Sequence, residues 1–153
     1  MSQENVQFVR GLVAGLMGTD LVPIFAHEAQ KRALADAFEP MLHPEFEFSA
    51  STRGMAALGG EYRGREVAVD GFMSTWSEAL TAWDTLVFEI EEVRELPDGR
   101  NLLLNRSHGR SKAAGVEIEG EHGNIYTVRN GKLLRFEQYL DRREALEAAG
   151  LRE

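Results

Sequence analysis

The sequence predicts an α+β fold in which N-terminal helices pack on one face of a strongly curved, mixed or antiparallel sheet. Apolar residues recur at three- and four-residue spacing through the first third of the chain, which is the period of an amphipathic helix. From Trp83 onward apolar and polar residues alternate, as they do in strands. Gly115, Gly120 and Gly123 indicate the bends or bulges that a curved sheet needs. Helices followed by a run of strands are typical of the α+β class.

The length and composition indicate an ordinary globular chain. With 153 residues, we expect one domain that covers 1–153. The absence of cysteine excludes disulfides, thiolate metal ligands and cysteine nucleophiles. The formal charge of -8 and the lack of a basic stripe predict that nucleic acid is not a partner. A polar, acidic start at Met1–Asn5, together with the lack of a long apolar run, predicts a cytoplasmic protein that does not enter a membrane.

Four helices are expected from apolar spacing and from capping residues. They run from Ser2 to Gly18, from Asp20 to the residue before Pro40, from Arg65 to Thr81, and from Asp141 to Gly150. The third helix carries an apolar stripe that includes Phe72 and Trp76. A short strand at Phe46–Ala50 and a glycine-rich loop over 54–64 are expected between the second and third helices.

The dipeptide Asn130-Gly131 predicts a two-residue type I′ hairpin turn near the end of the chain. In such a turn Arg129 faces Lys132, and pairing then runs outward along the two strands. The expected pairs are Thr127 with Leu134 and Ile125 with Phe136. Directly opposed residues point to the same face of a sheet, so the turn predicts which side chains share each face.

The apolar face of this hairpin is expected to be the inner one. It comprises Ile125, Thr127, Leu134, Phe136 and Gln138. Gln138 is the polar residue of the last strand on this face, and a buried amide requires hydrogen-bond partners. Those partners are either neighbouring protein groups or a ligand in a pocket, and the sequence leaves both open.

The opposite face of the hairpin is mixed and aromatic. Tyr126, Val128, Arg135 and Tyr139 lie on it in the predicted pairing. Protein interfaces favour tyrosine and arginine, so this outer face is predicted to form a homodimer. The alternative is a partly exposed sheet face with ordinary cross-strand pairs.

Several segments together resemble a SnoaL-like domain of the nuclear-transport-factor-2-like, ketosteroid-isomerase-like superfamily. They are Tyr62-Arg63-Gly64-Arg65-Glu66 before the helix with Phe72 and Trp76, then Glu91-Glu92-Val93, the stretch 109–117 and the ending 130–141. The resemblance implies a cone-like fold whose helices and curved sheet enclose a pocket for a small, mostly apolar molecule. The resemblance implies a fold that hosts isomerases, cyclases, epoxide hydrolases, dehydratases and non-catalytic binding modules, so fold alone does not identify an activity.

The residues that define three family mechanisms are partly replaced in this chain. Phe8 stands in the first helix, where ketosteroid-isomerase-like members use a tyrosine. Phe136 and Gln138 match the histidine and aspartate of SnoaL-like cyclases. Arg106-Ser107-His108 matches the Arg-x-Asp pair of limonene-epoxide-hydrolase-like members. The resemblance therefore leaves two functions open: an isomerase, cyclase or hydratase, and a non-catalytic ligand-binding or dimerisation module.

Arg106 and His108 are the candidate catalytic residues, because they alternate with Ser107 and share one face of a strand. A three-residue loop at Pro97–Gly99 turns both inward, where His108 is a general base and Arg106 holds a substrate oxygen. A two- or four-residue loop turns both outward into ion pairs with Glu89 and Glu91.

Two aromatic residues, Tyr62 and Trp76, are further candidates to line the pocket, with plain core packing as the alternative. No pair of histidines has metal-ligand spacing and no nucleotide-binding glycine motif is present, so neither a metal nor a cofactor is expected.

Overall fold

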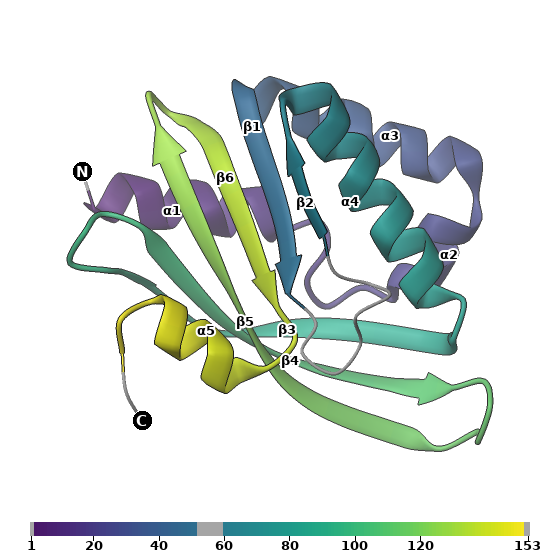
Figure 1. Ribbon diagram of the computed structural model, residues 1–153. Helices are drawn as coiled ribbons and strands as arrows, with labels where there is room; N and C mark the ends of the chain where they lie inside the picture. The colour runs from purple at the N-terminus through teal and green to yellow at the C-terminus, as the bar shows by residue number, and fades with distance from the viewer. Residues whose placement is uncertain (1, 52–59, 152–153) are drawn as a thin grey trace.

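The computed structural model describes residues 2–51 and 60–151, and its strands form one open, mixed sheet (Figure 1). The strands are β1 (Leu42–Ser51), β2 (Gly60–Arg63), β3 (Trp83–Glu95), β4 (Asn101–Ser111), β5 (Glu117–Arg129) and β6 (Lys132–Tyr139). Their order across the sheet is β2-β1-β6-β5-β4-β3. Neighbouring strands are antiparallel except β1 and β6, which are parallel. Figure 1 shows the curvature, because β1, β2 and β6 stand steeply inclined to β3 and β4.

The helices cover both faces of the sheet unequally. They are α1 (Ser2–Val13), α2 (Leu21–Ala26), α3 (Glu28–Phe38), the short 3₁₀ helix η1 (Glu39–Met41), α4 (Arg65–Leu80) and α5 (Arg142–Ala148). The inner face, as we call it, packs against α1, α2 and α4. On the opposite, outer face, Leu146 of α5 packs against Leu102 and Ile125 of β4 and β5. The predicted α+β class with helices on a curved, mixed sheet is confirmed.

The N-terminal helices end earlier than the apolar spacing predicts. The first helix ends at Val13 rather than at Gly18. Gly18 has a positive φ of 77°, which lets the chain turn there, and its N–H donates to the Phe88 carbonyl oxygen at 2.7 Å. The predicted single second helix is wrong, because the chain is extended at His27 and two helices result. The break allows α2 to bury Leu21 and Phe25, whereas α3 has no buried residue.

The third helix agrees closely with the prediction, since α4 covers Arg65–Leu80. Within the predicted loop over 54–64, Gly60–Arg63 forms strand β2 beside β1, and 54–59 lies outside the described residues. The last helix begins after Asp141, whose carboxylate accepts the Arg143 N–H at 2.9 Å. It ends at Ala148, two residues before Gly150, whose positive φ of 80° turns the chain after the helix.

The predicted turn between β5 and β6 is correct, but the pairing beyond it is wrong. Asn130 and Gly131 have the positive φ angles of 54° and 73° that a type I′ turn requires, and Arg129 pairs with Lys132. Val128 then pairs with Leu133, and the register shifts so that Thr127 pairs with Arg135. Leu134 is the extra residue of a β-bulge, and a shift of one residue exchanges the two faces of a strand.

The bulge reverses the predicted faces of β5. Tyr126 pairs with Phe136 and is buried in the main core, whereas the sequence placed it outside. Ile125 pairs with Glu137 and is buried beneath α5 on the outer face. Thr127, two residues further along β5, points to the same outer face and pairs with Arg135. Burial explains the choice, because the inner face gains the large ring of Tyr126.

None of the helices in the described residues combines the length and apolarity needed to cross a bilayer.

Candidate functional site

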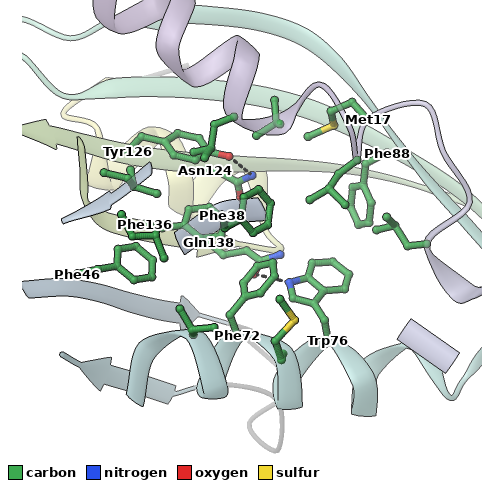
Figure 2. A pocket seen from close by; sticks show the side chains of 18 of the residues that line it. Met17, Phe38, Phe46, Phe72, Trp76, Phe88, Asn124, Tyr126, Phe136 and Gln138 are labelled. Atoms are coloured by element: carbon green, nitrogen blue, oxygen red, sulfur yellow. Dashed lines mark hydrogen bonds between the residues drawn. The ribbon is translucent and has the colours of Figure 1, made fainter. Parts of the chain in front are cut away.

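A cavity of about 100 Å³ lies between the inner face of the sheet and helices α1, α2 and α4 (Figure 2). Most of its lining is apolar. The lining residues are Leu12, Val13, Leu16, Met17, Leu21, Phe25, Phe38, Leu42, Phe46, Val69, Phe72, Met73, Trp76, Phe88, Asn105, Asn124, Tyr126, Leu133, Phe136 and Gln138. Apolar walls with a few polar groups are typical of small-molecule sites.

Aromatic rings from helices and strands form a continuous wall of this cavity. Phe72 and Trp76 project from α4, as Figure 2 shows, and their ring centroids lie 6.5 Å apart. Trp76 meets Phe88 of β3 edge to face at 5.4 Å. Phe72 lies 6.0 Å from Phe136, which stacks on Tyr126 at 4.9 Å. Such contacts hold the rings in place and so give the cavity a defined shape.

Three amide side chains give the cavity a polar end on the sheet. Asn105 comes from β4, Asn124 from β5 and Gln138 from β6, and Asn124 and Gln138 are directly paired across the strands. Gln138 Oε1 accepts the indole N–H of Trp76 at 3.1 Å, so strand and helix are joined across the cavity (Figure 2).

Two of these amides carry polar atoms without a partner in the described structure. Asn124 Nδ2 donates to the Tyr126 hydroxyl at 3.4 Å, whereas Asn124 Oδ1 and Asn105 Oδ1 accept no hydrogen bond. Both asparagines are almost fully buried, at 4% and 3% exposed. An unsatisfied buried polar group costs about 1–3 kcal/mol, so these oxygens are natural acceptors for a ligand.

The cavity is electrically neutral. Among the described residues of the lining there is no Asp, Glu, His, Lys or Arg. Burial raises the pKa of the Tyr126 phenol above its usual value, so this hydroxyl stays protonated at neutral pH and remains a hydrogen-bond donor. The site can therefore bind uncharged groups through hydrogen bonds, and it offers no carboxylate or imidazole for proton transfer.

Solved structures of other proteins share this architecture. No family model and no curated protein sequence matches the chain. An NTF2-like protein of unknown function from Burkholderia pseudomallei is 20% identical over 96% of this chain and 97% of its own, with a TM-score of 0.63. A putative SnoaL-like polyketide cyclase from Jannaschia is 13% identical over 99% and 95%, with a TM-score of 0.62. TerC, co-crystallised with polyporic acid, is 20% identical over 82% and 92%, with a TM-score of 0.56.

The chain has the nuclear-transport-factor-2-like (NTF2-like) fold. The resemblance that the sequence motifs indicated is thereby confirmed at the level of fold. At identities of 13–20% the similarity to these three proteins shows the fold alone.

The residues predicted to bind a ligand are only partly brought together. Phe136, Gln138 and Trp76 line the cavity of the NTF2-like cone. Tyr62 lies beside it in the core, with its ring stacked on Phe48 at 5.9 Å and 11°. Outside the lining lie Ile125, Thr127 and Leu134, the first two because the bulge turns them to the outer face.

Arg106 and His108 lie on the outer face of the sheet, away from the cavity. The hairpin between β3 and β4 pairs Glu95 with Asn101, and a register shift between Ile90 and Glu92 then pairs Arg106 with Glu89. The sequence left inward and outward placements open, and this irregularity is what decides between them.

Both side chains are half-exposed and contact carboxylates. Arg106 bonds Glu91 at 2.5 Å and Glu121 at 2.7 Å, and His108 Nε2 lies 2.9 Å from Glu89 Oε2. The pKa of Glu91 is lowered from its usual value, mainly by the hydrogen bond that its carboxylate accepts from Arg106. Because the polar ends of both side chains are directed to these carboxylates, neither residue reaches the cavity, and an inward His108 acting as base does not fit this geometry.

The four residues predicted to form a dimer surface divide between the two faces. Tyr126 and Val128 pack in the inner core. Arg135 lies outside, 2.7 Å from Glu47, and the Tyr139 hydroxyl donates to Glu137 at 2.9 Å. Homodimerisation through the outer face stays a prediction, with Arg135 and Tyr139 as its remaining residues.

Sequence reasoning missed Asn105 and Asn124. Each lies two residues from a side chain that points into the main core: Asn105 follows Leu103 on β4, and Asn124 precedes Tyr126 on β5. Side chains two residues apart on a strand share a face, so both asparagines also point inward. The signal was therefore present, but it became readable only once the bulge at Leu134 showed which face of β5 is inner. His122, two residues before Asn124, lies on the same face of β5.

Within residues 2–51 and 60–151, His, Asp and Glu side chains do not gather in threes in a way that could hold a metal ion.

Proposed function

We propose that this protein binds a small, uncharged and mostly apolar molecule in the cavity, with a hydrogen-bond donor of the ligand held by Asn105 and Asn124. The observation that carries the proposal is the pair of buried, unpartnered asparagine oxygens at one end of an aromatic cavity. A ligand hydroxyl or amide N–H at this position satisfies acceptors that otherwise destabilise the fold.

The lining supports a neutral ligand. Transferring a charge into an apolar cavity without a partner is costly, and the described lining offers no opposite charge. Aromatic walls suit a flat apolar body, because Phe72 and Trp76 can contact it through ring edges and faces. The likeness in fold to TerC, which was co-crystallised with polyporic acid, supports a small-molecule role.

Binding is favoured over acid–base catalysis in this cavity. An isomerase or cyclase of the kind that the sequence motifs suggested needs a group that takes up a proton, and here the lining supplies amides and one protonated phenol. An amide such as Gln138 orients a polar group but does not accept its proton.

Three ring compounds of similar size test the proposal. Phenol carries a hydroxyl donor, toluene carries none, and benzoate carries a charge. We expect phenol to bind most tightly, toluene more weakly and benzoate not at all, measured by thermal shift and isothermal titration calorimetry. Benzoate binding as well as phenol, or no binding by any of the three, contradicts the proposal.

Matched substitutions locate the polar end. Asn124→Leu is expected to weaken phenol binding about tenfold or more, since losing the hydrogen bond costs about 1–3 kcal/mol. Asn101→Leu is the control, because Asn101 is also fully buried with unpartnered side-chain atoms but does not line the cavity. Equal weakening by both variants assigns the effect to stability and not to ligand contact.

Substitutions on the outer face provide a second control. Arg106→Ala and His108→Ala are expected to leave the Kd for phenol unchanged, because both side chains pair with carboxylates away from the cavity. A large loss of affinity in either variant contradicts the outward placement.

A further inference from the structure

Ser107 and His122 face each other on the inner side of the sheet, next to the cavity but outside its lining. Ser107 Oγ lies 2.6 Å from His122 Nε2. The two residues are diagonal neighbours on β4 and β5, since Ser107 pairs with Gly120 and His122 with Asn105. Gly120 permits this contact, because a Cβ there would lie 2.8 Å from His122 Nε2 and 3.1 Å from Ser107 Oγ.

The hydrogen bonds of His122 determine which ring nitrogen carries the proton. Nδ1 lies 2.8 Å from the carbonyl oxygen of Leu140, and a carbonyl only accepts, so Nδ1 donates. In the neutral ring Nε2 is then the acceptor, and the Ser107 hydroxyl donates to it. In this arrangement an imidazole can remove the proton of a serine hydroxyl.

The surroundings of the pair are apolar on one side and open on the other. The ring of Phe88, which also lines the cavity, lies 5.4 Å from the imidazole of His122. Asn105, two residues before Ser107 on the same face of β4, carries a side-chain amide. Further along that face the β4–β5 hairpin reaches solvent at Ile118, which is 43% exposed. Ser107 itself is 8% exposed, so the hydroxyl is sheltered, and His122 is partly exposed.

We propose that Ser107 is a nucleophile and His122 its general base, and that the pair reacts with esters of small, apolar carboxylic acids. The apolar acyl group follows from the Phe88 ring beside the imidazole. The inference rests on the Ser107–His122 pair and its neighbours Phe88 and Asn105, and it does not depend on what the cavity binds.

The steps are those of acyl transfer through an ester intermediate. Ser107 Oγ attacks the carbonyl carbon of the ester while its proton passes to His122 Nε2. The bond from that carbon to the alcohol oxygen breaks, and the alcohol leaves with the proton from Nε2. Water then gives a proton to Nε2 as its oxygen attacks the acyl carbon. Finally the bond to Oγ breaks, the acid departs and Oγ takes back the proton. The Asn105 amide can donate a hydrogen bond to the carbonyl oxygen as it becomes negative.

A fluorophosphonate probe, which reacts with activated serines, tests the assignment. The wild-type protein is incubated with the probe, digested, and its modified peptides are mapped by mass spectrometry. We expect one modified residue, Ser107. Absence of modification, or modification confined to other residues, overturns the proposal. Because the mapping uses the wild-type protein, the result does not depend on whether a variant folds.

Variants and a chromogenic ester complete the test. Ser107→Ala is expected to abolish probe labelling and hydrolysis of p-nitrophenyl butyrate, and His122→Gln to slow both about 100-fold or more. Ser74→Ala is the matched control, because Ser74 Oγ donates to the Gly71 carbonyl on its own helix and has no imidazole partner in the described structure. Labelling that persists in Ser107→Ala, or that is lost equally in Ser74→Ala, overturns the assignment.

Discussion

Tyr126 and Phe136 lie face to face on the inner side of the sheet, with ring centroids 4.9 Å apart and ring planes 12° from parallel. The stack exists because Leu134 bulges out of β6, which brings the inner positions of β5 and β6 opposite each other. Tyr126 is 2% exposed and forms part of both the core and the cavity wall. The stability of this wall and its shape therefore depend on one ring pair.

Tyr126→Ala is expected to lower the free energy of unfolding by about 3–5 kcal/mol, because it removes a large buried ring. Tyr126→Phe keeps the ring and removes only the hydroxyl, so the expected change is about 1 kcal/mol. Urea unfolding followed by circular dichroism measures both. A small effect of the alanine variant places the ring outside the core.

Two helical glycines are expected to respond oppositely to the same substitution. Gly11→Ala in α1 should raise the free energy of unfolding by about 0.5–1 kcal/mol, because alanine favours helix and no atom lies within 4 Å of the new Cβ. Gly71→Ala in α4 should lower it by about 1–3 kcal/mol, since its Cβ would lie 2.5 Å from the ring of Tyr62. Thermal unfolding of both variants checks the signs. If both substitutions raised the free energy of unfolding, the ring of Tyr62 would have to move aside freely.

Asp20 joins the start of α2 to strand β3. Its Oδ1 accepts the Val22 N–H at 3.1 Å and the Leu86 N–H at 3.0 Å. Asp20→Ala leaves both donors unpaired and is expected to lower the free energy of unfolding by about 2 kcal/mol. Asp20→Asn keeps an oxygen acceptor and should retain most of the stability. Equal losses in chemical denaturation of the two variants would mean that the charge, and not the hydrogen bonds, stabilises this junction.

His122 is expected to make the protein less stable in mild acid. Burial lowers the pKa of His122 below its usual 6.5, and Arg142 acts in the same direction, against the Leu140 carbonyl and Glu121. Between the unfolded-state pKa near 6.5 and the lower folded-state pKa, the unfolded chain binds more protons. The free energy of unfolding therefore falls as the pH falls through this window, and it is recovered above the unfolded-state pKa.

Urea unfolding at a series of pH values from about 7.5 to 5 measures this dependence. The matched variant His122→Gln cannot take up the proton, so its stability should vary less over the same range. Parallel curves for the two proteins would show that other groups cause the pH dependence.

Local features of the chain were predictable from sequence because their causes lie within a few residues. The Asn130-Gly131 turn depends on backbone angles that these two residues adopt at low cost. The amphipathic stripe of α4 and the capping carboxylates of Asp20 and Asp141 are equally local. The fold class follows from the order of such elements, and the residues that resemble SnoaL-like domains pointed to the same fold.

The candidate site was only partly predictable, because its assembly depends on register. Phe136, Gln138 and Trp76 were placed correctly in the cavity wall, since alternation and helical spacing locate them within their own elements. Asn105 and Asn124 were not recognised, because the inner face of β5 depends on the bulge at Leu134 in its pairing with β6, and β4 pairs in turn with β5.

By itself, the sequence determined the elements, the turn at Asn130-Gly131 and the class of fold. The tertiary structure alone decided the bulge at Leu134, the break at His27 and the outward direction of Arg106. Each of these is a choice between local conformations of similar energy. The burial of side chains from elements far apart in the sequence, such as Tyr126 in one core with Val9 of α1 and Phe48 of β1, settles the choice, and no short segment contains these partners.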